Sequence, residues 1–84
     1  MMIYVNDLEV GDKFDVNELM ERQGIMRSSL PGGDIQDFTA TVLGICQDYL
    51  RSDEYLCIRF KVEGYVNDWR LMKKQVVKVV SLVS

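Results

Sequence analysis

The stretch EYLCIRFKVEG, residues 54–64, decides the fold because its side chains alternate strictly in character. Every second position carries a large apolar side chain: Leu56, Ile58, Phe60 and Val62. The positions between them carry Tyr55, Cys57, Arg59 and Lys61. Successive side chains of a β-strand point to opposite faces, so this pattern predicts a strand with one buried face and one outer face.

Residues 39–49 (TATVLGICQDY) are rich in β-formers and predict the preceding strand, which turns back at residues 52–53. The expected facing pairs are Arg51–Glu54, Tyr49–Leu56, Gln47–Ile58, Ile45–Phe60 and Leu43–Val62. This register is favoured because a slip of one residue would turn the apolar set outward. It places Cys46 and Cys57 on the outer face, one diagonal step apart.

A third strand is expected after a four-residue loop at residues 64–67. Trp69 and Leu71 would then join the core, and Arg70 and Met72 would lie on the outer face, with Arg70 opposite Lys61. The last predicted strand, residues 76–83, is apolar on both faces apart from a lysine and a serine. Such a strand fits the closing position of a barrel or a position buried in an oligomer.

The N-terminal third predicts a short strand and a short helix. LEVGDKF, residues 8–14, is expected to form the first strand around a turn at Gly11 and Asp12. Asp15 and Glu18 have the spacing of a helix capping box, and Gly24 stands where a helix C-terminal glycine would. Leu19 and Met20 would face inward from this helix.

Four stretches together resemble the small SH3-like β-barrel superfold: LEVGDKF, FTATVLGI, YLCIRFKV and DWRLMKKQVVKVVSL. The resemblance implies a mainly β chain forming a five-stranded barrel. Residues 15–37 would be an enlarged first loop that carries the helix. The 84 residues suffice for one domain, residues 1–84. The chain is also similar in general appearance to small phage and bacterial proteins.

The composition excludes most catalytic chemistry. The chain has no histidine, which removes histidine bases, histidine-dependent nucleophiles and most transition-metal sites. Two cysteines cannot build a four-cysteine zinc site, and LPGGD, residues 30–34, lacks the lysine and hydroxyl residue of a phosphate-binding loop. We therefore expect no enzyme activity, no cofactor and no metal.

Charge and hydropathy bear on location and partners. No apolar run approaches the ~20 residues that a helix needs to cross a bilayer, and residues 1–7 lack a basic leader. We expect a cytoplasmic (intracellular) protein without a membrane partner. The net charge of −3 is uneven: residues 1–37 hold eight acids and three bases, whereas residues 59–78 hold six bases and two acids. Such regions attract charged partners.

The outer face suggests a non-catalytic protein-interaction module, such as an adaptor or an inhibitor. Its predicted contact residues are Tyr55, Arg59, Lys61, Arg70 and Met72, together with Ile25, Met26 and Leu30 of the loop GIMRSSLPGGDIQD. A strand face that mixes apolar and basic side chains indicates a covering surface. The cover would be another protein, for which a phage-type modulator of a host or defence factor is one example. A homodimer through the C-terminal strand is also predicted.

Two alternatives stay open for the same face. The chain's own residues 15–37 could cover it. The chain could also be a nucleic-acid-binding small β-barrel, because such barrels bind single strands with aromatic and basic side chains. The residues that could supply them are Tyr55, Arg59, Lys61, Tyr65, Trp69 and Arg70. The negative net charge weakens non-specific attraction to phosphate.

Overall fold

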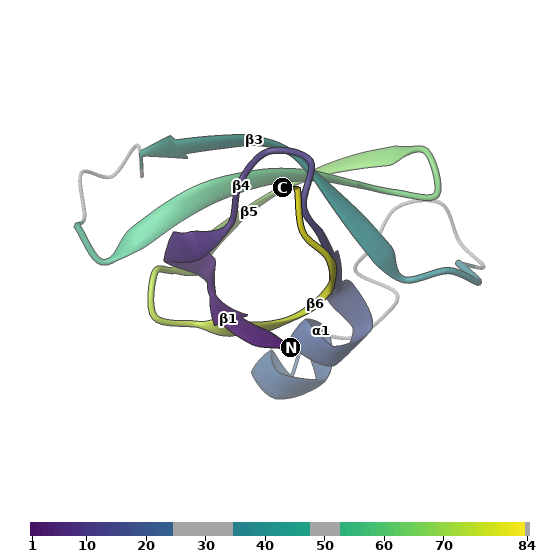
Figure 1. Cartoon of the computed structure of the whole chain (residues 1–84), viewed down its shortest axis with the longest axis horizontal. Coiled ribbons are helices and arrows are strands. Elements are labelled where there is room, and N and C mark those ends of the chain that lie inside the picture. The colour runs from purple at the N-terminus through teal and green to yellow at the C-terminus, as the bar shows by residue number, and fades with distance from the viewer. Residues whose placement is uncertain (25–34, 48–52, 84) are drawn as a thin grey trace.

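The computed structural model describes residues 1–24, 35–47 and 53–83. Its elements are β1 (Met2–Tyr4), the 3-10 helix η1 (Val5–Asp7), β2 (Lys13–Asp15), α1 (Val16–Gln23), β3 (Thr39–Gln47), β4 (Tyr55–Val62), β5 (Tyr65–Met72) and β6 (Val76–Ser81). The prediction of a mainly β chain is confirmed. The strands form one antiparallel sheet in the order β1-β6-β2-β3-β4-β5 (Figure 1).

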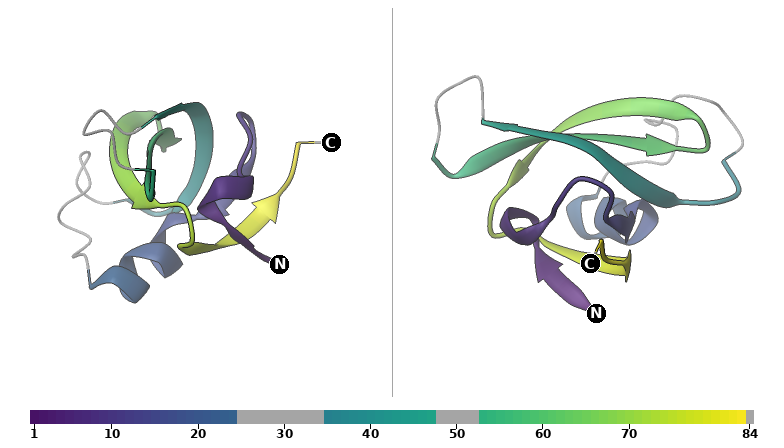
Figure 2. Two further views of the ribbon diagram at one scale, coloured as in Figure 1. Left: turned by 90° about the vertical axis from the view of Figure 1, so that its left-hand side faces the viewer. Right: turned by 45° about the horizontal axis from the view of Figure 1, so that its top comes forward.

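The sheet bends so that β3, β4 and β5 arch over β6, β1 and the helix (Figures 1 and 2). It does not close: β1 stands at one end and β5 at the other. The predicted five-stranded barrel is therefore not observed among the described strands. The strand number differs as well, because Met2–Tyr4 adds a sixth strand along β6, pairing Ile3 with Val77.

The predicted first strand, residues 8–14, is wrong in extent because the strand formed here, β2, covers only Lys13–Asp15. The preceding residues turn around Asp12, whose side chain is buried. Its carboxylate accepts hydrogen bonds from the backbone N–H groups of Glu9 at 2.8 Å and Val83 at 2.7 Å. A buried carboxylate needs such partners, so Asp12 fastens this turn to the C-terminal segment.

The predicted helix is confirmed at both ends. The carboxylate of Asp15 accepts a hydrogen bond from the N–H of Glu18 at 3.1 Å, as an N-cap residue does. Gly24 ends the helix with φ of 68°, in the left-handed region that glycine adopts without steric cost. Leu19 and Met20 are buried as expected, and α1 packs against β6 and β3.

The β3–β4 register differs from the prediction by two residues. Ile58 faces Ile45 instead of Gln47, and Cys57 faces Cys46. A bulge between Val42 and Gly44 then changes the alternation of β3. Val42 is buried opposite Phe60, and Leu43, which was expected in the core, is 41% exposed. Glycine in a strand often marks a bulge, because it has no side chain to pack.

The β4–β5 turn is shorter than the predicted four-residue loop. Val62 pairs with Tyr65, which leaves only Glu63 and Gly64 between the strands. Both turn residues have positive φ, 47° and 88°, as a type I′ hairpin requires. The carboxylate of Glu63 also accepts hydrogen bonds from the N–H groups of Gln36 and Asp37, at 3.0 and 2.7 Å.

The core lies between the arched strands and β6. The four alternating apolar residues of β4, Leu56, Ile58, Phe60 and Val62, are all buried as predicted. The Phe60 ring meets Phe14 edge to face at 5.6 Å and Trp69 at 5.0 Å between centroids. Trp69 therefore packs against the core as expected, and such aromatic pairs add to the stabilisation from area burial alone.

Candidate functional site

The outer face of β4 and β5 brings together five of the predicted contact residues. The pairs across these strands on this face are Tyr55–Met72, Cys57–Arg70, Arg59–Asp68 and Lys61–Val66. The strands therefore hold Tyr55, Arg59, Lys61, Arg70 and Met72 on one face, as expected. The predicted pairing of Lys61 with Arg70 is wrong, because the two-residue turn displaces β5 by four residues relative to the expected register.

The centre of this outer face is an ion pair. The Arg59 guanidinium donates two hydrogen bonds to the Asp68 carboxylate, at 2.8 and 3.0 Å. The side-chain hydrogen bond from Arg59 lowers the pKa of Asp68, and the same bond raises the pKa of Arg59. Sequence reasoning missed the pairing of Asp68 with Arg59, because the predicted register set Asp68 opposite Glu63.

A second cation of the face is held by an aromatic ring. The guanidinium carbon of Arg70 lies 3.6 Å from the centroid of the Tyr55 ring. A cation over an aromatic face gains electrostatic attraction, and the ring limits the orientations of the long side chain. Met72, which faces Tyr55 across the strands, leaves a flexible apolar side chain 44% exposed beside this pair.

Apolar side chains border the charges. Leu43 on β3 is 41% exposed and Val66 on β5 is 53% exposed, in addition to Met72. Leu43 reaches the surface because of the bulge, which sequence reasoning did not detect; Gly44 was the available signal. The outer face therefore combines exposed apolar surface with charges of fixed orientation.

Both cysteines lie directly opposite each other on neighbouring strands. Cys46 of β3 pairs with Cys57 of β4, so the predicted diagonal arrangement is wrong. Neither of these two cysteines forms a disulfide. Directly opposite positions bring the Cβ atoms to roughly 4.5–5.5 Å, which approaches the ~4 Å separation of a disulfide.

The remaining predicted contact residues, Ile25, Met26 and Leu30, lie outside the described residues. The same holds for most of the loop that could cover the outer face. Within the described part of residues 15–37, the helix α1 packs against β6 and β3, and Gln36 and Asp37 meet the β4–β5 turn at Glu63.

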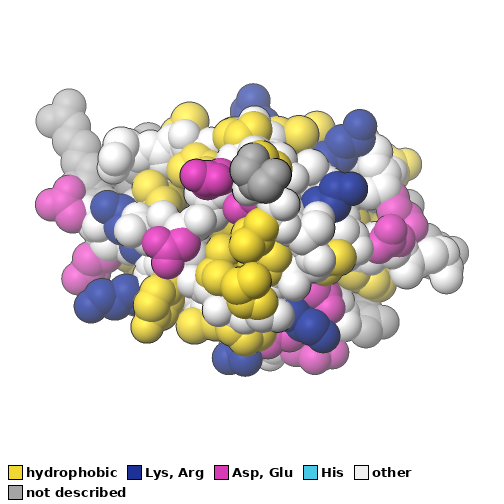
Figure 3. Space-filling view, viewed as in Figure 1, with side chains coloured by type: hydrophobic (Ala, Val, Ile, Leu, Met, Phe, Trp, Pro, Cys, Tyr) yellow, Lys and Arg dark blue, Asp and Glu magenta, His cyan; other side chains and the backbone are white. Residues whose placement is uncertain are grey.

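The C-terminal strand presents a second apolar surface. Hydrophobic side chains gather near the middle of the face in Figure 3, over β1, β6 and the C-terminal end. The exposed large apolar residues on these segments are Met1, Met2, Tyr4, Val80, Leu82 and Val83. Because β1 and β2 flank β6, the predicted homodimer through this strand would have to use side chains rather than backbone pairing.

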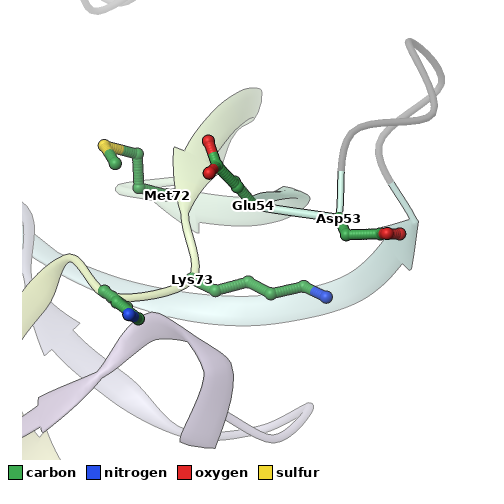
Figure 4. Close-up of a pocket in the computed structure, with 5 residues that line it drawn as sticks. Asp53, Glu54, Met72 and Lys73 are labelled. Carbon is green, nitrogen blue, oxygen red and sulfur yellow. The ribbon is translucent and has the colours of Figure 1, made fainter.

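A shallow pocket lies where β5 turns towards β6. Its volume is about 330 Å³, and it is lined by Asp53, Glu54, Met72, Lys73 and Lys74 (Figure 4). The Lys73 side chain extends across the pocket on the side of Asp53 (Figure 4). The lining mixes both signs of charge, and it supplies no nucleophile paired with a base.

Residues 1–24, 35–47 and 53–83 contain no group of three metal-ligating side chains. No helix in these ranges has the length and apolar character needed to cross a membrane. Comparison of the chain with protein-family models, with curated proteins and with solved structures finds no match.

Proposed function

We propose that the protein is a non-catalytic interaction module whose outer face, formed by β3, β4 and β5, binds another protein. The observation that carries this proposal is the exposed apolar surface of Leu43, Val66 and Met72 beside the Arg59–Asp68 ion pair. Protein-binding surfaces combine apolar area with polar groups that set orientation. The module would act as an adaptor or as an inhibitor of its partner.

Two long side chains on the outer face are already oriented in the free protein, which favours binding to a protein partner. Arg59 is fixed by Asp68, and Arg70 is placed over Tyr55. Ordering such side chains on binding costs about 0.5–1.5 kcal/mol each, so part of that cost is already met in the free protein. Arginine and tyrosine are also the residue types that most often dominate binding energy at protein interfaces.

For the architecture, we propose that the fold is related to the SH3-like small β-barrel superfold. It is supported by the pairing of the last strand, β6, with β2, and by the helix placed between β2 and β3. We propose an intracellular setting, in which Cys46 and Cys57, which form no disulfide, remain reduced. A phage-type modulator of a host or defence factor is one class of protein that such a module would fit.

The binding test compares three versions of the full chain. The face variant, Tyr55→Ser with Lys61→Glu, removes an aromatic ring and reverses a charge on β4. The matched control, Gln23→Ser with Lys78→Glu, makes the same change in charge at two exposed positions off this face. A protein captured by the wild type is purified, and its affinity for each version is measured by calorimetry.

The proposal expects wild type and control to bind alike and the face variant to lose at least tenfold in affinity, which corresponds to about 1.4 kcal/mol. Equal binding by all three versions would contradict it, and so would the capture of no protein. Circular dichroism of each version confirms that the comparison is made between folded chains.

A nucleic-acid-binding module is the second candidate, because Tyr55, Arg59, Lys61 and Arg70 share one face. The Arg59–Asp68 pair weakens it, since that arginine is already neutralised. Fluorescence anisotropy with single-stranded oligonucleotides at low salt decides between the two candidates. Binding that falls with salt and is lost in Lys61→Ala with Arg70→Ala would replace the protein-binding proposal.

A further inference from the structure

Strand β5 is an open edge of the sheet. It pairs with β4 on one side only, and no other described strand lies along its second side. It is eight residues long and contains no proline, whereas the edge strand at the other end, β1, has three residues. Long unprotected edges are templates for pairing with another strand.

The register shows which backbone groups of β5 point to this edge. The N–H of Lys73 donates to the carbonyl of Glu54 at 2.8 Å, which continues the β4–β5 ladder just beyond Leu71. In an antiparallel pair, the residues that exchange hydrogen bonds recur at every second position. The residues between them turn their N–H and C=O groups outward: Val66, Asp68, Arg70 and Met72.

These four residues are complementary to their own sequence read in reverse. If two β5 strands pair antiparallel about a two-fold axis at Trp69, Asp68 faces Arg70 of the second copy, and Val66 faces Met72 of the second copy. All four contacts across the axis then join opposite charges or two apolar side chains. Opposite charges at facing positions stabilise an antiparallel pair, whereas like charges destabilise it.

The alternation of the backbone fits the same axis. The N–H and C=O groups that point to the open edge belong to even-numbered residues of β5. An axis at Trp69 places even-numbered residues of the two copies opposite each other. Each outward N–H group therefore meets a C=O group of the second copy. Asp68 retains acceptor capacity beyond its two bonds from Arg59, because a carboxylate offers about four lone-pair sites. The ion pair within one chain is therefore compatible with Arg70 of a second copy.

We propose that two copies of this chain associate through antiparallel pairing of their β5 strands about a two-fold axis at Trp69. The two six-stranded sheets become continuous, and their outer faces lie side by side on the same surface. This interface uses the backbone edge of β5 and does not depend on the proposed partner of the outer face. It differs from a dimer through β6, which has strands on both sides.

The test uses two single charge reversals of the full chain, Asp68→Arg and Arg70→Asp, with Leu43→Lys as a control on the same face but on β3. Light scattering with size-exclusion chromatography measures the mass over a range of concentrations. Wild type and control should reach twice the 9.7 kDa of one chain. Each reversal alone places like charges at both central pairs and should remain a monomer under the same conditions.

The decisive sample is the equimolar mixture of the two reversals. One chain then carries two arginines and the other two aspartates at positions 68 and 70, so both facing pairs are complementary again. The mixture should form a heterodimer, although neither variant dimerises alone. A monomeric wild type overturns the proposal. So does a wild-type dimer that survives both reversals, as a dimer through the apolar surface of β1 and β6 would.

A second variant keeps the test valid if a charge reversal disturbs folding. Val66→Lys with Met72→Lys changes two exposed side chains and leaves the Arg59–Asp68 pair intact. Lysines then face each other at both ends of the paired strands, and the variant should be monomeric. A dimer as stable as that of the wild type would contradict the proposed register.

Discussion

Asp68 of β5 lies opposite Arg59 of β4 and accepts two hydrogen bonds from its guanidinium, at 2.8 and 3.0 Å. The pair sits on the exposed surface, where its contribution to folding is small and depends on salt. Its main consequence is electrostatic: one of the three basic side chains on the outer face is neutralised. That leaves a face of mixed character, which suits a protein surface better than a phosphate backbone.

The first prediction concerns the titration of Asp68. The hydrogen bond from Arg59 lowers the pKa of Asp68, and Arg59→Gln should raise it towards its ordinary value. The ionised carboxylate is the form that binds Arg59. Its small contribution to stability is therefore complete above the pKa of an unfolded aspartate and is lost as the pH falls through the lowered pKa.

Carboxyl-carbon NMR titration of wild type and Arg59→Gln measures this change. Asp37 is the internal control, because its pKa is lowered mainly by the backbone hydrogen bond from Thr39, which Arg59→Gln leaves in place. An Asp68 midpoint that is the same in both proteins would show that the ion pair does not form in solution.

The second prediction concerns the buried carboxylate of Asp12. Asp12→Ala removes the acceptor for the N–H groups of Glu9 and Val83 and should lower the free energy of unfolding by about 2 kcal/mol. Asp12→Asn keeps one acceptor oxygen and should lose less. Urea denaturation measures both, with Asp53→Ala at an exposed position expected within about 0.5 kcal/mol of wild type. If the Asp12→Ala variant is as stable as wild type, these two hydrogen bonds do not stabilise the fold.

The third prediction concerns the facing cysteines. Because Cys46 and Cys57 are direct partners on neighbouring strands, mild oxidation should join them within one chain. Mass spectrometry of a non-reducing digest detects the linked peptides, and Cys57→Ser is the control that cannot form them. If oxidation yields only disulfides between chains, the observed β3–β4 register is wrong.

The fourth prediction concerns the helix cap. Asp15→Ala removes the acceptor for the N–H of Glu18 and should cost about 1 kcal/mol in unfolding free energy. Asp15→Ser keeps a capping oxygen and should recover most of that loss. Thermal unfolding followed by circular dichroism compares the two. Equal losses would mean that packing of Leu19 and Met20, rather than the cap, determines whether α1 forms.

Alternation in the sequence predicted the two faces of β4 and β5 correctly. Leu56, Ile58, Phe60 and Val62 are large and evenly spaced, so burial alone selects one face. The helix was equally predictable from the sequence, since Asp15, Glu18 and Gly24 act within a few residues of each other.

The registers between strands could not be predicted from the sequence, because they depend on single turns and bulges. A shift of an even number of residues keeps every side chain on its face, so apolar patterning cannot detect it. The two-residue turn at Glu63 and Gly64, both with positive φ, sets the β4–β5 register, and the Arg59–Asp68 pair follows from it. The bulge between Val42 and Gly44 shifts the β3–β4 register by one further residue and brings Leu43 to the surface. Strand β1 was missed because three residues give too short a pattern.

The central claim is that the outer face of β3, β4 and β5 contacts another protein, and site-specific photocrosslinking tests it most directly. A photoreactive amino acid replaces Met72 on this face or, as the control, Glu21 on the exposed side of α1. In its native cells, the chain labelled at position 72 should form a discrete crosslink to one other protein, and the chain labelled at position 21 should not. Crosslinks from position 72 only to nucleic acid or to a second copy of the chain, or none at all, would contradict the claim.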